Sequence, residues 1–102
     1  MQSEKLKKLG FNDSVRGVRY MDSALRLMEN NQFIRITDLY DKLASEFGTT
    51  SNNITSGIAY AIRKWWFAVS PEEKKKYFPL NSNLGIAPTN KVFLMTLANK
   101  KM

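Results

Sequence analysis

The most informative segment of this 102-residue chain is residues 37–66, TDLYDKLASEFGTTSNNITSGIAYAIRKWW. Its first part, 37–47, predicts an amphipathic helix, because apolar side chains recur at the spacing of one helical face: Leu39, Tyr40, Leu43, Ala44 and Phe47. Gly48 follows, and glycine commonly ends a helix because it adopts a positive φ without strain. Thr49 or Thr50 then offers a hydroxyl that can cap a second helix.

That second helix is predicted from about residue 50 to residue 66, with one apolar and one polar face. The apolar face predicts a buried stripe of Ile54, Ile58, Ala61, Ile62 and Trp65. The other face carries small or hydrogen-bonding side chains: Ser51, Asn52, Asn53, Thr55, Ser56 and Tyr60. Two helices joined by a short turn, the second with a polar outer face, form the layout of a DNA-reading helix-turn-helix. Helical hairpins without a DNA role share this spacing.

The remainder of the chain shows further helical patterns and no strand-length alternation. The further helices expected are 4–9, 14–29, 71–78 and one capped by Thr89 or Asn90. Residues 79–88 are predicted to form a loop. Gly17 and Gly57, each inside a predicted helix, indicate close contact with another backbone. We therefore predict an all-α fold, a single compact domain over residues 1–102 with about six helices, in which residues 37–66 are the helix-turn-helix.

Composition excludes several classes of function. Cysteine and histidine are absent, which removes disulfides, thiolate–zinc sites and the commonest general base. No paired catalytic carboxylates, phosphate-binding loop or metal-ligand spacing is present, so we expect neither an enzyme nor a cofactor. The N-terminal residues carry charges without an apolar core, and the longest apolar run, 65–69, is too short to cross a bilayer. We expect a soluble cytoplasmic domain with no membrane partner.

The net charge of +7 is concentrated in the C-terminal part of the chain. Residues 63–102 contain eight basic and two acidic side chains, a sum of +6, whereas residues 1–62 sum to +1. The basic side chains of this part are Arg63, Lys64, Lys74, Lys75, Lys76, Lys91, Lys100 and Lys101. A surface of this kind binds DNA by counterion release. A solvated basic face is the main alternative, and an anionic membrane surface is a weaker one because no helix combines a strong apolar face with a dense basic face.

Three adjacent aromatic residues, Trp65, Trp66 and Phe67, end the second helix of the predicted motif. Core packing is the simplest explanation for them. Successive side chains of a helix are about 100° apart, so at least one of the three must lie on the surface. We expect this to be Trp65 or Phe67.

Four motifs occur in a fixed order between about Leu6 and Lys100. They are Gly17-Val18-Arg19-Tyr20-Met21 with Ala24-Leu25, Ile36-Thr37-Asp38-Leu39-Tyr40 with Leu43-Ala44, Gly48-Thr49-Thr50 with Ile54, Ile58, Ala61, Ile62 and Trp66, and Pro88-Thr89-Asn90 with Phe93. In this order they resemble the C-terminal effector domain of the stage-zero sporulation response regulator, a transcription factor of endospore formers. The resemblance covers nearly the whole chain.

The resemblance implies an all-helical DNA-binding domain whose fourth helix enters the major groove, often as a head-to-tail dimer on tandem sites. The partners it implies are double-stranded DNA, a second copy of the chain, and RNA polymerase or another regulator. Full-length relatives carry a receiver domain before this module. That domain is missing here, so the chain is either a stand-alone relative or a fragment.

The second helix of the motif departs from the family pattern where it matters for reading bases. The family carries Arg, Glu-Arg and Arg-His where this chain has Asn53, Thr55-Ser56 and Ala59-Tyr60. The bidentate arginine–guanine contact therefore does not transfer. Asn52 or Asn53 can pair with adenine instead, and a threonine methyl can touch thymine.

The expected DNA-binding residues combine this polar face with nearby cations: Thr50, Ser51, Asn52, Asn53, Thr55, Ser56, Tyr60, Arg63, Lys64 and Lys91. The neutral side chains lie where bases would be read, and the basic C-terminal part would bind phosphates. The alternative is a protein–protein interaction module that keeps the fold and has lost sequence-specific DNA reading.

Overall fold

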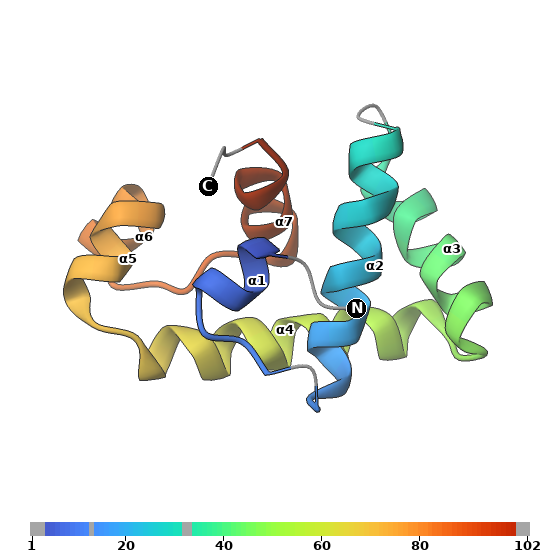
Figure 1. Cartoon of the computed structure of the whole chain (residues 1–102), viewed down its shortest axis with the longest axis horizontal. Coiled ribbons are helices and arrows are strands. Elements are labelled where there is room, and N and C mark those ends of the chain that lie inside the picture. Colours follow the sequence, from blue (N-terminus) through green and yellow to red (C-terminus); the bar gives the residue numbers. More distant parts are fainter. Residues whose placement is uncertain (1–3, 13, 32–33, 100–102) are drawn as a thin grey trace.

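The computed structural model describes residues 4–12, 14–31 and 34–99 and shows an all-helical chain over them (Figure 1). The described helices are α1 (Glu4–Lys8), α2 (Arg16–Asn30), α3 (Ile36–Phe47), α4 (Ser51–Ala68), α5 (Pro71–Tyr77), α6 (Pro79–Leu84) and α7 (Asn90–Asn99). The all-α prediction is confirmed. Seven helices are described where about six were expected.

The longest helix, α4, forms a base on which the other helices rest (Figure 1). Helices α2 and α7 stand across it, α3 packs beside its N-terminal end, and α5 and α6 follow its C-terminal end. One hydrophobic core joins α4 to the helices above it. The largest fully buried side chains include Leu6, Met21, Leu25, Leu39, Leu43, Ile54, Ile58, Ile62, Phe93, Leu94 and Leu97. The apolar residues of α3, α4 and α7 supply most of this core.

Two glycines set the distance between α2 and α4. A Cβ atom on Gly17 would lie 2.7 Å from the carbonyl carbon of Gly57 and 2.9 Å from the Cβ of Ala61. Real Cβ atoms almost never come this close to another heavy atom, so only glycine fits at position 17 while the helices keep this separation. The predicted close backbone contact is confirmed for Gly17, whereas at Gly57 the closest atoms to an added Cβ belong to the ring of Tyr20, at 2.9 Å.

The turn of the helix-turn-helix forms as its residue types predict. Gly48 ends α3 in the left-handed region, with φ 63°. Of the two candidate caps it is Thr50 that caps α4, because its Oγ1 accepts a hydrogen bond of 3.1 Å from the backbone N–H of Asn53. Ser70 caps α5 in the same way, and Thr89 accepts the N–H of Val92 at 3.2 Å in the first turn of α7.

The predicted loop over residues 79–88 is wrong for its first part, where α6 forms. Pro79 stands at the first helical position, which suits its fixed φ, and Gly85 closes the helix with φ 70°. Six residues are too few to show a helical period in sequence, and Leu80 and Leu84 lie four residues apart on a face that remains exposed. Phe33, an apolar residue just before the helix-turn-helix that we expect from the sequence to pack in the core, lies outside the described residues.

Of the three adjacent aromatic residues at the end of α4, two are buried and one is exposed, as the helical geometry requires. Trp65 and Trp66 are 6% and 3% exposed, whereas Phe67 is 80% exposed. The indole N–H of Trp65 donates a hydrogen bond of 2.9 Å to the carbonyl oxygen of Leu9. This bond fastens the segment between α1 and α2 to α4.

Candidate nucleic-acid interface

The outward face of α4 is the surface that the helix-turn-helix exposes. Five exposed side chains occur along it at intervals of four, four, three and four residues: Asn52, Ser56, Tyr60, Arg63 and Phe67. At about 100° per residue they fall within roughly 80° of one another, and at about 1.5 Å per residue they extend over roughly 22 Å. We call this set the α4 outer face. The major groove of B-DNA is wide enough to admit an α-helix that presents such a face.

The N-terminal turn of α4 uses several of the expected DNA-binding side chains in its own structure. The Oγ of Ser51 donates to Asp41 Oδ1 at 2.6 Å, joining the two helices of the motif. The amide of Asn53 donates to Thr49 Oγ1 at 2.9 Å. Together with the cap made by Thr50, these bonds fix the turn, so these polar groups have a structural role whatever else they bind.

Thr55 lies at the contact between α4 and α7. Its hydroxyl donates to the backbone oxygen of Ser51 at 2.9 Å, and its side chain is partly buried. Its own carbonyl oxygen accepts a 3.0 Å hydrogen bond from the side-chain amide of Asn90, the first residue of α7. The structure thus places Thr55 beside the outer face rather than at its centre, and the bond from Asn90 attaches the N-terminus of α7 to the N-terminal part of α4.

Asn52 and Ser56 differ from these neighbours. Both are exposed, and neither side chain makes a hydrogen bond with the part of the chain that the structure describes. An asparagine amide carries both a donor and an acceptor, which is the combination that the adenine edge requires in the major groove. Of the two asparagines named from the sequence, Asn52 is therefore the one whose amide is free to read a base.

Two cations follow on the C-terminal half of α4. Arg63 and Lys64 are both exposed, and the Lys64 ammonium lies 6.0 Å from the centre of the Tyr60 ring. This half of the helix therefore presents a cationic and aromatic surface, whereas the N-terminal half presents neutral polar groups. The sequence of α4 contains no acidic residue.

Lys91 has a basic neighbour that the sequence analysis did not name. Lys91 is the second residue of α7, is exposed, and lines a shallow depression together with Arg35. Arg35 is the residue that precedes α3. Because these two cations are 56 positions apart in the sequence, only the folded structure places them at one depression, which Met28 of α2 also lines.

Arg16 and Arg19 form a second basic group that sequence reasoning missed. They line a depression that also includes Gly48 and Thr49, the turn between α3 and α4. The sequence did offer a hint of their position, because both arginines lie within two residues of Gly17, for which a close contact with another backbone was predicted. In the structure the close approach of Gly17 to Gly57 places this end of α2 against α4. Basic side chains from α2 therefore flank the turn, as Arg35 and Lys91 line the depression beside the start of α3.

The lysines of α5 are arranged differently. The Lys74 ammonium lies 5.0 Å from the centre of the Trp66 ring, and that of Lys76 lies 5.2 Å from the centre of the Tyr77 ring. Such contacts stabilise a cation against an aromatic face. Lys100 and Lys101 lie outside the described residues.

Within residues 4–12, 14–31 and 34–99 no three acidic side chains come together in a way that would hold a metal ion. None of the helices described is both long and apolar enough to cross a membrane.

Comparison with known proteins agrees with the resemblance found in the sequence. The family model described as "Sporulation initiation factor Spo0A C terminal" matches residues 3–101. A comparison with curated proteins gives no match. Because the family model covers almost the whole chain, the chain belongs to the family of Spo0A C-terminal domains, which are DNA-binding domains of a transcription regulator.

Proposed function

We propose that this chain binds double-stranded DNA with α4 in the major groove, as the effector-type domain of a transcription regulator. The observation that carries the proposal is the α4 outer face, which is exposed over its whole length on a helix without acidic residues. Carboxylates on this face would repel phosphates, and their absence leaves a surface that a polyanion can approach.

The two halves of α4 have different roles in this proposal. In helix-turn-helix proteins the N-terminal residues of the recognition helix contact base edges. Asn52 and Ser56 occupy that half here, with Thr50, Ser51, Asn53 and Thr55 beside them. Arg63 and Lys64 lie about 15 Å further along the helix and contact phosphates.

Phosphate contacts outside α4 hold the helix in the groove. Lys91 lies in the first turn of α7, where backbone N–H groups and the ammonium can bind the same phosphate. Arg35 and the arginines that start α2 add positive charge on either side of the motif. Binding of two copies to tandem DNA sites and contact with RNA polymerase or another regulator belong to the same proposal.

Selection of sites from a random duplex pool, at low and at physiological salt, tests the proposal. Recovery of a sequence motif supports it. Retention at low salt without any motif would show phosphate-driven association only and would refute base reading by α4. No retention at either salt would refute DNA binding altogether.

A pair of double variants tests whether side chains of α4 make the phosphate contacts. We expect Arg63→Ala/Lys64→Ala to weaken DNA binding and to reduce the slope of log affinity against log salt by up to about 1.8, since each phosphate contact contributes roughly 0.9. The matched control is Lys7→Ala/Lys8→Ala, which removes the same charge from exposed positions in α1. An equal reduction in both double variants would show that overall charge, and not α4, determines binding.

The second candidate function is a protein-interaction module without DNA reading. It is favoured by exposed apolar side chains at the C-terminal end of α4 and around α6: Phe67, Leu80, Leu84 and Ile86, which are 59–80% exposed. Surfaces of this kind commonly contact other proteins. This function would gain support if the pool selection retained no DNA.

A further inference from the structure

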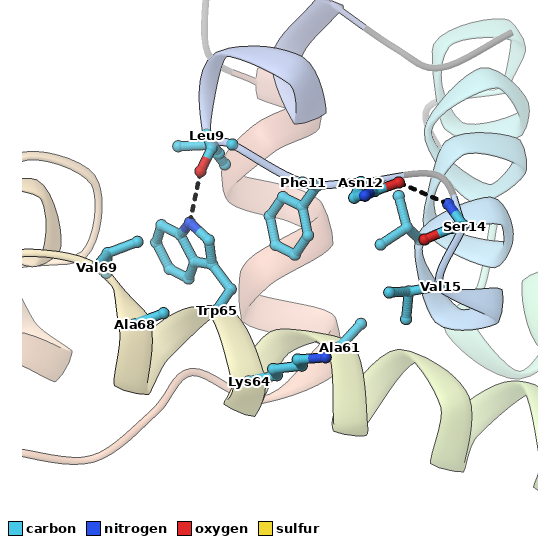
Figure 2. A pocket seen from close by; sticks show the side chains of 12 residues that line it. Leu9, Phe11, Asn12, Ser14, Val15, Ala61, Lys64, Trp65, Ala68 and Val69 are labelled. Carbon is cyan, nitrogen blue, oxygen red and sulfur yellow. Dashed lines mark hydrogen bonds between the residues drawn. The ribbon is translucent and has the colours of Figure 1, made fainter.

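A groove lies between α4 and the segment that joins α1 to α2 (Figure 2). Its volume is about 450 Å³, within the range of roughly 300–1,000 Å³ that is typical of small-molecule sites. Apolar side chains make up most of its walls: Phe11, Val15, Trp65 and Val69. The bond from the Trp65 indole to the Leu9 carbonyl fixes one wall in place before any ligand arrives.

The charge of the groove has a single source among the described residues that line it, namely Lys64. Its side chain runs along α4 toward Ala61, below the rings of Trp65 and Phe11 (Figure 2). The polar groups at the far side already bind each other, because the backbone N–H of Ser14 donates to Asn12 Oδ1 at 2.9 Å. An apolar groove with one cation at its edge complements a molecule with an apolar body and one negative charge.

The shape of the apolar walls favours a flat body. The rings of Phe11 and Trp65 are nearly parallel, with 21° between their planes and 5.8 Å between their centres. A planar ring can pack along such a surface in the offset or edge-on arrangements that aromatic groups prefer. We propose that this groove binds small aromatic carboxylates, with the ring against Phe11 and Trp65 and the carboxylate at Lys64.

Lys64 belongs to two surfaces at once, which gives the site a regulatory consequence. It lines the groove, and it also lies 6.0 Å from the ring of Tyr60 on the α4 outer face. This step rests on the proposed function, in which Lys64 contacts a DNA phosphate. A carboxylate held at Lys64 neutralises that contact, so a bound ligand lowers DNA affinity by about fivefold at moderate salt.

The first test measures ligand binding to the full chain without DNA. The probe is 3-phenylpropionate, and its neutral counterpart is 3-phenylpropan-1-ol. In ¹H–¹⁵N NMR titrations at millimolar concentrations we expect the Trp65 indole N–H resonance and the Phe11 amide resonance to shift. The acid should bind two- to fivefold more tightly than the alcohol, as one exposed charge pair allows.

Three variants locate the site. Lys64→Met should reduce the affinity for the acid to that for the alcohol, whereas Lys75→Met, which removes the same charge from α5, should change neither. Ala68→Phe should exclude both probes, because Ala68 lines the groove. Ala68 is exposed, so the larger side chain does not enter the core, and a thermal melt confirms folding. Absence of shifts in the wild-type chain, or equal affinity for acid and alcohol, would overturn the assignment.

The second test measures DNA affinity by fluorescence anisotropy with and without 3-phenylpropionate. We expect the acid to weaken DNA binding of the wild-type chain and to leave that of Ala68→Phe unchanged. Undiminished DNA affinity with the groove occupied would overturn the regulatory coupling. A chain that binds the acid but no DNA at all would refute the proposed function and the coupling with it, while the NMR result would still establish the groove as a ligand site.

Discussion

Replacement of Gly17 by alanine should destabilise the fold even though alanine is the better helix former. The added Cβ would lie 2.7 Å from the carbonyl carbon of Gly57, and an ordinary contact begins at 3.4 Å. The carbonyl oxygen of Gly57 would lie closer still, so the two helices must separate by more than about 0.7 Å at their crossing, and a gap of this size forfeits at least a quarter to a half of the dispersion energy of the contacts involved. Overpacking of this kind costs about 1–3 kcal/mol, and the upper end applies because backbone cannot swing aside.

The helix propensity of alanine offsets part of this cost, by about 1 kcal/mol. We expect a net loss of about 2 kcal/mol in the free energy of unfolding, measured by urea denaturation with far-ultraviolet circular dichroism. In a domain of this size such a loss lowers Tm by roughly 8–16 °C.

Gly57→Ala is the matched control for this prediction. A Cβ there would meet the ring of Tyr20 at 2.9 Å, with the backbone of Gly17 at an ordinary 3.8 Å. A ring at the end of a side chain can shift where a backbone cannot, so Gly57→Ala should cost clearly less than Gly17→Ala. Equal losses in the two variants, or a Gly17→Ala chain as stable as wild type, would refute the argument that backbone contact sets the spacing of these helices.

Three further substitutions test contacts that fix the ends of helices. Thr50→Ala removes the cap of α4 and should cost about 1 kcal/mol in urea denaturation, whereas Thr50→Ser keeps the hydroxyl and should cost little; equal losses would show that the cap does not stabilise the turn. Trp65→Phe leaves the buried carbonyl of Leu9 without its hydrogen-bond donor, so the free energy of unfolding should fall by about 1–3 kcal/mol and amide hydrogen exchange in α1 should become faster. Unchanged exchange would contradict the view that this bond anchors the segment between α1 and α2 to α4. Lys5→Met removes hydrogen bonds of 2.7 and 3.3 Å to carbonyls at the end of α7 and should cost about 1 kcal/mol, while Lys8→Met, at an exposed position, should be neutral; a neutral Lys5→Met would contradict the role of this lysine as a cap.

The helix-turn-helix was predictable because its signals are local. Gly48 at the end of one helix, Thr50 before the next and the apolar spacing of both helices lie within 30 residues, and each corresponds to one physical requirement of a helix end or a buried face. The contact of Gly17 with another backbone was also predictable, since an interior glycine weakens a helix unless something needs the space.

The features that were not predicted are a short helix, contacts between residues that are far apart in the sequence, and polar residues that can serve more than one role. Helix α6 is too short to show a period, and its Leu80 and Leu84 face solvent. Arg35 joins Lys91 only through the packing of α7. Polar residues at a helix start serve equally to cap the helix or to bind DNA. The sequence therefore did not show that Asn53 bonds to Thr49 while the Asn52 side chain makes no hydrogen bond within the described part of the chain.

The hydrogen bond from Asn90 to the backbone of Thr55 makes α4 and α7 a single stiff element at the proposed interface. The distance from the N-terminal half of α4 to the backbone of Lys91 is then set by the packing of the protein. Under the proposed function the duplex must adapt to this spacing, since the protein does not. We therefore expect the preferred sites to be distinguished partly by how easily they bend or change groove width, with flexible pyrimidine–purine steps favoured at positions that no side chain touches.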